Sequence, residues 1–555
     1  MISKKLIWTI LFLIVVLSSV LRLWQLGNVP PSPDWDEVAL GYSSYSIIHT
    51  GKDEFGKFLP VVLRSFDDYK PALYAYLTIP SILIFGLSVF AVRLPSAFFG
   101  IISVVAVFYL VRELFEEYKY KDYLALISSF LLAISPWSIQ FSRVGFESNI
   151  GICLNILMVL FFIKGLKKPW MLSLSAFFAG LSIYSYQSEK VFTPLLVLAL
   201  ALIFRKELFS LGRKYVFFAI IVGLIVVMPM AFYILNNKAA LLRVTGTSVF
   251  SYQTELLKNN IQKLEWDKAT NDKLGLILDN RRIVYAKTIV EGYISHFNLN
   301  WLFIKGDIAR HHAPNMGLLY LFEFPFILLG IYKLIFGDFD KKTKLFIFSW
   351  FLIAPIPASI TSGVPHAVRT LNFLPTFQIF TTIGLISAFQ FVSSIKYQVL
   401  SIRVKYLIFN LCILFFIFNL FYYLNQYFVQ LNYYDSAEWQ YGYKQAVDEV
   451  NKLQGSYSQI IVSDRQPMDK SYMFFLFYLK YPPQNYQEVS EYSSGGYGAN
   501  HFFDKYTFKS IDWERDSVKK NVLIIGVPSD IPNRVPVIKR IYNLDGTEAI
   551  RIAGT

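Results

Sequence analysis

The sequence predicts an α-helical polytopic membrane protein with about 11–12 transmembrane helices, further helices at the outer interface and a small C-terminal α/β extracytoplasmic domain. Hydrophobic residues make up 54% of the 555 residues and charged residues only 17%, which excludes an ordinary soluble protein. Apolar runs close to the thickness of a bilayer recur between residue 6 and about residue 427. The tail that follows instead alternates short apolar runs with turn residues, as a small α/β domain does.

The net charge of +14 fits a role of Lys and Arg in orienting the chain in the plasma membrane better than it fits nucleic-acid binding. Cys153 and Cys412 both lie in apolar runs, so we expect no disulfide framework. The apolar stretch after Lys4-Lys5 has no small-x-small cleavage site, which favours an uncleaved first span over a signal peptide.

Twelve apolar segments follow one another along the chain. They cover residues 6–24, 72–90, 96–111, 124–141, 149–163, 170–186, 191–204, 215–235, 316–336, 345–360, 371–392 and 405–427. Six basic clusters lie at their ends: Lys4-Lys5; Arg112, Lys119 and Lys121; Lys164 and Lys167-Lys168; Arg205-Lys206 with Arg213-Lys214; Lys341-Lys342 and Lys344; and Lys396, Arg403 and Lys405. The positive-inside rule assigns all six clusters to the cytoplasm.

If all twelve segments cross the membrane, the N-terminal lysines and the later clusters fall on opposite sides. Removing segment 72–90, which follows Lys70-Pro71 and contains Pro80 and Gly86, reconciles all six clusters. The predicted topology then has eleven spans, a cytoplasmic N-terminus and an extracytoplasmic C-terminus. The alternative is that 72–90 does span and the first segment is oriented against its own lysines.

The predicted topology places most unusual polar residues on the outer side, in a first outer loop (25–95), a large outer loop (236–315) and short turns. We divide the chain into a transmembrane domain (1–430) and an α/β domain (431–555). In the second domain, 458–463 and 521–526 have strand patterns, and 535–543 with 548–552 predict a hairpin across Asp545-Gly546.

Asp36 and Glu37 form an acidic pair just beyond the first apolar segment, after a Pro-rich stretch. The pair predicts a reaction centre at a helix start, partly enclosed by Trp35 and Tyr42. The alternative is helix N-capping, which requires only one carboxylate. Lys70 beside the removed segment either anchors the chain at the interface by snorkelling or meets a lipid phosphate.

Arg143 and Glu147 lie between two apolar segments with almost no room for a loop. Ionisable side chains so close to the hydrocarbon are costly and usually functional, which favours a role in the site. Their spacing of four residues also allows a simple ion pair on one helix.

Two outer segments contain histidines. In Arg310-His311-His312, neighbouring histidines on a strand would point to opposite sides, and no Cys or His-x3-His accompanies them, which favours a lipid-phosphate or acceptor contact over a metal site. His366 and Arg369 are three residues apart at the expected start of a helix, where the helix N-terminus adds partial positive charge. They form either a phosphate cradle or a cap with a boundary anchor.

The ordered set of these motifs resembles the GT-C superfamily of polytopic glycosyltransferases, in particular the bacterial glycosyltransferase family 39 branch related to protein O-mannosyltransferases and the lipid A aminoarabinose transferase. The resemblance covers residues 6–427. It rests on Asp36-Glu37, Asp68-Tyr-Lys70-Pro71-Ala-Leu73, Val92-Arg-Leu-Pro-Ser-Ala97, Ser142-Arg-Val-Gly-Phe-Glu147, Tyr186-Gln187, the Arg310-His-His run and Pro365-His-Ala-Val-Arg369.

The resemblance implies that Asp36 is the catalytic base, that Glu147 is the second acidic residue of the site and that Lys70 meets the donor phosphate. Where the family motif more often has Glu-Lys-Pro-Pro, this chain has Tyr69-Lys-Pro-Ala72, so no role is carried over to Tyr69. The expected substrate-binding residues are Glu37, Lys70, Arg143, Gln187, Arg310, His311, His366 and Arg369.

The implied reaction is inverting transfer of a sugar from a polyprenyl-phosphate donor to an acceptor hydroxyl on a protein, lipid or glycan outside the membrane. A need for a divalent metal stays open, and no nucleic acid is expected. A polytopic secondary transporter or flippase of lipid-linked substrates is the alternative, although it predicts internal repeats and mid-span polar residues. A non-enzymatic lipid-binding scaffold is a third, and it gives Asp36 no function.

Overall fold

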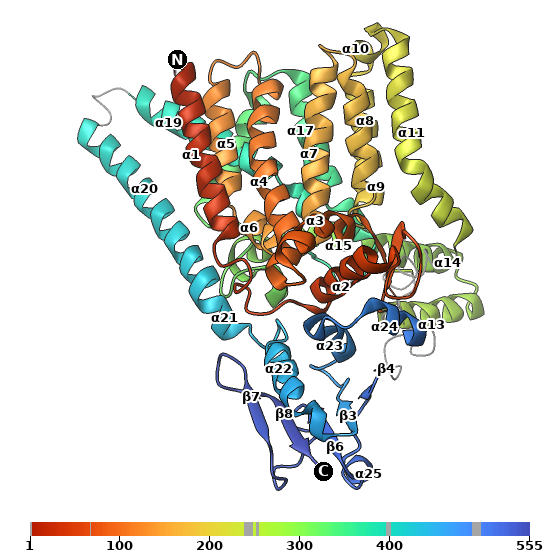
Figure 1. Ribbon diagram of the computed structural model, residues 1–555. Coiled ribbons are helices and arrows are strands. Elements are labelled where there is room, and N and C mark those ends of the chain that lie inside the picture. The colour runs from red at the N-terminus through yellow and green to blue at the C-terminus, as the bar shows by residue number, and fades with distance from the viewer. Residues whose placement is uncertain (1–2, 67, 238–247, 251–254, 396–400, 491–500) are drawn as a thin grey trace.

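The computed structural model describes residues 3–66, 68–237, 248–250, 255–395, 401–490 and 501–555. Figure 1 shows upright helices above an α/β domain. Each of the twelve apolar segments contains a helix: α1 (Lys4–Leu23), α3 (Leu73–Phe85), α4 (Val89–Leu114), α5 (Lys121–Ile134), α7 (Glu147–Gly165), α8 (Met171–Ser182), α9 (Glu189–Ile203), α11 (Arg213–Asn236), α16 (Glu323–Phe336), α17 (Lys341–Ile353), α19 (Thr376–Ser394) and α20 (Ile402–Asn425). The predicted helical membrane class with a small C-terminal α/β domain is confirmed.

Within the described residues, six helices are long and apolar enough to cross a membrane by themselves. They are α1, α4, α7, α11, and the helices over Leu371–Ser394 and Ile402–Tyr434. A seventh span results if α5 and α6 (Pro136–Ser142) are counted as one, with a bend of 57° between them. Pro136 explains the bend, because proline has no N–H to continue the helix and disfavours a helical residue before it. The other predicted spans correspond to shorter helices.

Helix ends that carry basic clusters, namely the start of α1, the short helix α10 (Arg205–Ser210) and the start of α11, lie at the same end of the bundle (Figure 1). Segments that carry other basic clusters contact one another. Lys167, which follows α7, forms an ion pair of 3.0 Å with Glu113 of α4. Thr343, within the basic start of α17, donates a hydrogen bond of 3.0 Å to the carbonyl of Leu114 at the end of α4. The predicted topology requires the basic clusters to lie at the same end of the bundle. Lys396 lies outside the described residues.

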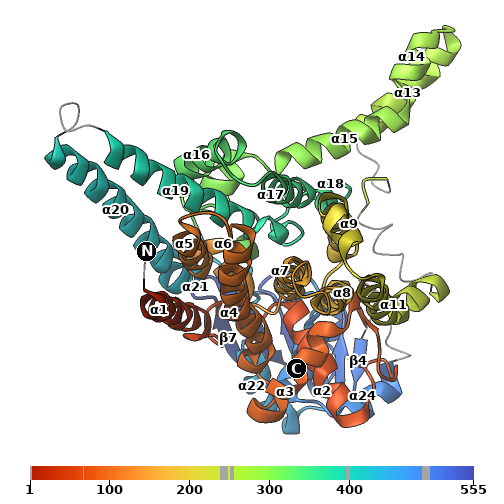
Figure 2. The ribbon, with the colours of Figure 1, turned by 90° about the horizontal axis from the view of Figure 1, so that it is seen from above.

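The opposite end of the bundle is covered by helices that lie across it, α2 (Trp35–Thr50) and α3, which are side by side (Figure 1). A hairpin of β1 (Val62–Ser65) and β2 (Asp68–Pro71) joins them. The position of α3 supports the removal of segment 72–90 from the spans. Viewed from above, α13 (Glu255–Ala269), α14 (Lys273–Leu278) and α15 (Arg281–Ser295) of the large outer loop extend away from the bundle as an arm (Figure 2).

The C-terminal domain contains a six-stranded mixed sheet in the order β4-β5-β3-β6-β8-β7. Its strands are β3 (Gln459–Val462), β4 (His501–Phe503), β5 (Tyr506–Phe508), β6 (Val522–Gly526), β7 (Lys539–Tyr542) and β8 (Glu548–Gly554). The strands predicted at 458–463 and 521–526 and the C-terminal hairpin are confirmed, and Gly546 takes the positive φ of +88° that its turn requires. Strands β4 and β5 were not predicted. The helices are α22 (Tyr443–Leu453), α23 (Ser471–Leu479), α24 (Pro483–Ser490) and α25 (Trp513–Asp516).

Helix α2 is packed between the membrane bundle and the C-terminal domain. Its Val38 and Tyr42 belong to one hydrophobic core with Val92 of α4 and Phe477 of α23. A Cβ atom on Gly41 would lie 2.6 Å from Val92 Cγ2 and 2.7 Å from Phe477 Cε2, so only glycine permits this approach. The helix that contains the acidic pair is therefore fixed from both sides.

Helices α16 and α19 approach each other through two glycines. A Cβ on Gly330 would overlap the carbonyl oxygen of Phe380, and a Cβ on Gly384 would overlap that of Phe326. The contact is reciprocal, so each glycine admits the backbone of the partner helix. Small residues of this kind allow close helix packing in membranes, where the hydrophobic effect does not drive association.

We expect Gly384→Ala to destabilise the protein by about 1–3 kcal/mol, because overpacking forces the two backbones apart. Gly223→Ala is the matched control, since its nearest neighbour would be Ala176 Cβ at an ordinary 3.6 Å. The measurement is the thermal unfolding midpoint of purified protein in detergent. Equal midpoints for the two variants would contradict the close contact.

Candidate functional site

The start of α2 is closed by a capping box formed by Asp34 and Glu37. Asp34 Oδ1 accepts from the Glu37 N–H at 2.9 Å, and Glu37 Oε2 accepts from the Asp34 N–H at 3.2 Å. The N-cap is thus Asp34, two residues before the acidic pair. Asp34 therefore caps the helix, and Asp36, for which we considered helix capping as the alternative to a catalytic role, is not the cap.

Glu37 also takes part in a buried ion pair with Arg93 of α4. Arg93 Nε lies 2.8 Å from Glu37 Oε1 and Nη2 lies 2.9 Å from Oε2, and both side chains are at most 1% exposed. The N–H of Gly145 donates to Oε1 as well, at 2.9 Å. Both carboxylate oxygens of Glu37 thus have partners within the protein, and its substrate-binding role stays a prediction.

Asp36 points away from this buried pair and contacts Lys70 of β2 through an ion pair. The Lys70 side chain is only 7% exposed, whereas that of Asp36 is 32% exposed. Gln187 contacts the same strand, since its Nε2 donates a hydrogen bond of 2.7 Å to the carbonyl oxygen of Tyr69. The structure therefore brings together Asp36, Lys70 and Gln187, three residues selected from distant parts of the sequence.

Arg310 reaches this group from η3 (Ala309–His311), a single 3-10 turn. Its Nη1 lies 3.3 Å from Asp34 Oδ2, and its guanidinium carbon lies 4.0 Å from the centre of the Trp35 ring. Burial, with the nearby Asp36 charge, raises the pKa of the Asp34 carboxyl well above its usual range. Arg310 thus places its positive charge against Asp34 and Trp35, the two residues that precede Asp36.

Arg143 differs from our expectation of a phosphate contact. It is fully buried at the end of α6, and it donates to the carbonyls of Leu21 at 2.9 Å and Val29 at 3.0 Å. Its guanidinium also lies 4.8 Å from the ring centre of Phe428. These contacts direct its charge into the protein, where it ties the end of α1 to the following loop.

Glu147 begins α7 and is 5% exposed, so it and Arg143 lie on different helices, and the helical ion-pair alternative does not apply. It follows by two residues Gly145, whose N–H binds Glu37. Glu147 is therefore a buried carboxylate at the start of α7, two residues after the backbone N–H that binds Glu37.

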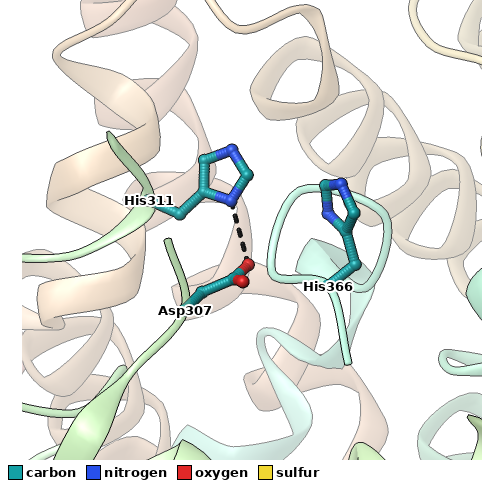
Figure 3. A group of neighbouring side chains, drawn as sticks. All are labelled: Asp307, His311 and His366. Atoms are coloured by element: carbon teal, nitrogen blue, oxygen red, sulfur yellow. Dashed lines mark hydrogen bonds and ion pairs between the residues drawn. The ribbon is translucent and has the colours of Figure 1, made fainter. Parts of the chain in front are cut away.

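A second group consists of Asp307, His311 and His366, which point toward one another (Figure 3). A hydrogen bond of 2.9 Å joins His311 Nδ1–H to Asp307 Oδ2, and the Ala367 N–H donates to the same oxygen at 2.6 Å. The two imidazole centres are 5.2 Å apart. Among the described residues, Nδ1 of His366 is buried and has no hydrogen-bond partner.

This group can hold a divalent metal ion. One ligand atom from each residue lies within 4.8 Å of the others, and two imidazoles with one carboxylate are a common donor set for zinc and similar ions. Burial lowers the pKa of His311 and lowers that of His366 further, so both are neutral at pH 7 and have a lone pair for a metal. Burial opposes ionisation of Asp307, yet the His311 hydrogen bond lowers its pKa below the usual range.

The sequence argument against a metal assumed that Arg310-His311-His312 form a strand. They instead form a 3-10 turn followed by an extended residue, which turns His311 inward, whereas His312 Nε2 lies 2.6 Å from the Asp307 carbonyl oxygen. Asp307 was overlooked, although it lies four residues before His311. A carboxylate at that spacing from a histidine could have been noticed.

The helix expected at His366 does not begin there, because α19 starts at Thr376. His366 and Arg369 therefore do not lie at a helix N-terminus. Arg369 Nη1 instead donates to Thr361 Oγ1 at 2.6 Å and to the Ser362 carbonyl at 2.7 Å. Both alternatives considered for His366 and Arg369 assumed a helix start at this point, and the structure has none there, so a phosphate contact of the two residues stays a prediction without the help of a helix N-terminus.

We expect the purified protein to bind about one Zn²⁺ per chain, and we expect His366→Ala and His311→Ala each to weaken this binding by ten-fold or more, since each removes one of three ligands. The measurement is metal content by elemental mass spectrometry after equilibration against a zinc buffer series. His49→Ala, at an exposed histidine of α2, is the control. Unchanged metal content in both ligand variants would exclude the site.

The chain is similar to known proteins in one segment of its sequence and in its fold. Residues 69–233 match the family described as "Dolichyl-phosphate-mannose-protein mannosyltransferase", while no curated protein sequence matches. ArnT from Cupriavidus metallidurans bound to undecaprenyl phosphate has a similar structure, with a TM-score of 0.54, 12% identity and 100% of each chain covered. Its apo state gives a TM-score of 0.55 and 14% identity, also over 100% of each chain. Residues 69–233 therefore carry the sequence signature of the protein mannosyltransferase family, and the whole chain has the fold of ArnT.

Proposed function

We propose that this enzyme transfers a sugar from a polyprenyl-phosphate donor to an acceptor hydroxyl on the side of the membrane where the C-terminal domain lies. The proposal includes inversion at the anomeric carbon, with Asp36 as the general base. The observation that carries it is the pair of Asp36 and Lys70. Of the three carboxylates at the start of α2, Asp34 caps the helix and Glu37 binds Arg93, whereas Asp36 is partly open to a substrate.

In this mechanism the acceptor oxygen attacks C1 of the sugar while its proton passes to the Asp36 carboxylate. The bond from C1 to the phosphate oxygen breaks, and its electron pair leaves with the lipid phosphate. General-base assistance of this kind is worth roughly 10²–10⁴ in rate. Lys70 and Arg310 supply positive charge where the leaving phosphate becomes more anionic, which is the largest contribution in many such sites.

The choice of a lipid-linked donor has two supports. The family match begins at Tyr69 and so includes Lys70, Glu147 and Gln187 of the site. ArnT from Cupriavidus metallidurans, which has this fold, is bound to undecaprenyl phosphate. A membrane-embedded scaffold around a polar site fits a donor with a long apolar tail. Glu147 is the second carboxylate of the proposed site.

The proposed orientation places the basic end of the bundle in the cytoplasm, because Lys and Arg residues are retained on that side. The N-terminus is then cytoplasmic, and Asp36, Lys70 and the C-terminal domain are outside. The contacts among the basic clusters at one end support this orientation.

We expect Asp36→Asn to lower transfer from a polyprenyl-phosphate sugar by roughly 10²–10⁴ with an unchanged unfolding midpoint, since the amide cannot accept the proton. The measurement is transfer of labelled sugar from a panel of polyprenyl-phosphate donors to membrane acceptors. Glu438→Gln, an exposed carboxylate of the same side, is the control and should retain activity. Full turnover in Asp36→Asn would exclude the base, and no transfer by the wild type from any donor would exclude the donor class.

The orientation is tested with single cysteines in a variant in which Cys153 and Cys412 are replaced. A membrane-impermeant maleimide on intact cells should label Thr547→Cys, at the exposed tip of the β7–β8 hairpin, and should not label Lys168→Cys, at the exposed basic end. Labelling of both positions on the same side would show that the number of spans between them has the wrong parity.

A further inference from the structure

In the C-terminal domain, the loop that follows the carboxyl end of the central strand, β3, contacts the candidate site. Strand β3 is parallel to both β5 and β6 and lies between them. The carboxyl ends of such strands are where sheets of this kind place functional loops. The loop after β3 runs from Ser463 to Lys470, directly before α23.

Lys470 at the end of this loop contacts the residue that precedes Asp36. Its Nζ lies 3.8 Å from the centre of the Trp35 ring, and its side chain is only 9% exposed. Arg310 lies 4.0 Å from the centre of the same ring. The backbone N–H of Trp35 donates to Gln440 Oε1 at 3.1 Å, which is a second contact from the C-terminal half of the chain.

The conformation of Lys470 is unusual for a residue with a side chain. Its φ of +66° lies in the left-handed region that lysine rarely adopts. Its ammonium also lies 2.9 Å from Asp469 Oδ2, so the charge is held on both sides, by a carboxylate and by an aromatic ring. Strained residues held by their surroundings are concentrated at functional sites.

We propose that Lys470 is a positioning residue of the transfer reaction, through which the C-terminal domain becomes part of the active centre. By holding Trp35, Lys470 fixes the first turn of α2 and with it the direction of Asp36 relative to Lys70. The proposal rests on the proposed function of Asp36. A partly buried cation on a tryptophan ring is held more strongly than an exposed one, which suits such a role.

The test compares Lys470→Met, Lys470→Arg and the control Lys480→Met. Methionine keeps the length and the apolar stem but removes the charge, whereas arginine keeps the charge and stacks on aromatic rings. Lys480 is an exposed lysine at the other end of α23 that also has a positive φ, of +49°. The measurements are kcat and KM for the polyprenyl-phosphate donor, and amide hydrogen exchange of the peptide that contains Trp35 and Asp36.

We expect Lys470→Met to lower kcat roughly tenfold with little change in KM, because a small misplacement of the base affects the chemical step. Exchange in the Trp35 peptide should rise. Lys470→Arg should restore both values, and Lys480→Met should match the wild type. Wild-type turnover and exchange in Lys470→Met would overturn the proposal, as would an equal loss in the Met and Arg variants together with a lower unfolding midpoint.

The two proposals fail in different ways. If the wild type transfers no sugar from any polyprenyl-phosphate donor, the proposed function is wrong, and the exchange measurement still decides whether Lys470 holds Trp35. If the wild type transfers sugar and both readouts are unchanged in Lys470→Met, only the role of Lys470 is wrong.

Discussion

The structure of the site depends on the buried ion pair between Glu37 and Arg93. Besides Glu37, the Arg93 guanidinium binds the carbonyls of Leu26, Pro30 and Ser32, at 2.8–3.1 Å, so one side chain ties the first outer loop, α2 and α4 together. Such a pair is costly to bury and is tolerated because all its polar groups have partners. Loss of either charge would leave the other buried without its partner, at a cost of about 3–5 kcal/mol. The pair therefore contributes a fixed position for the start of α2 more than it contributes stability.

Because the start of α2 is fixed, the neighbouring carboxylates of Asp36 and Glu37 have different surroundings. Successive residues of an α-helix point about 100° apart, and the Asp36 side chain is 32% exposed whereas that of Glu37 is 1% exposed. Glu37 faces α4, and Asp36 faces β2 and Lys70. An acidic pair in the sequence thus becomes one buried anchor and one partly exposed group. The C-terminal domain completes the arrangement, since α2 also packs against α23.

The sequence was sufficient for the parts of the fold that depend on hydropathy and local pattern, namely the helical segments, strands β3 and β6, the hairpin of β7 and β8, and the common end of the basic clusters. It was insufficient where a role depends on a distant partner. Glu37 and Arg93 are 56 positions apart, and Ala367 and Asp307 are 60 apart. Arg143 has the same sequence context as a phosphate ligand, yet backbone carbonyls that only the fold supplies determine its direction. Asp36 was selected because an ionisable residue beside a membrane span is rare enough to be informative, and Lys70 was selected through the resemblance of its Lys-Pro motif.

The short turn η3 connects the two polar groups of the site. Arg310 and His311 are neighbours on it, and the Arg310 carbonyl accepts from Gln140 Nε2 at 2.6 Å, which fixes the turn on α6. His311 belongs to the group with Asp307 and His366, whereas Arg310 lies against Trp35 and Asp34. A metal ion bound by the histidines would restrict this turn further and would thereby hold Arg310 in place against Asp34 and Trp35. The ligand atoms of Asp307, His311 and His366 are directed at one another, whereas Arg310 on the same turn is directed at Asp34 and Trp35, so the turn joins the two groups without mixing their partners.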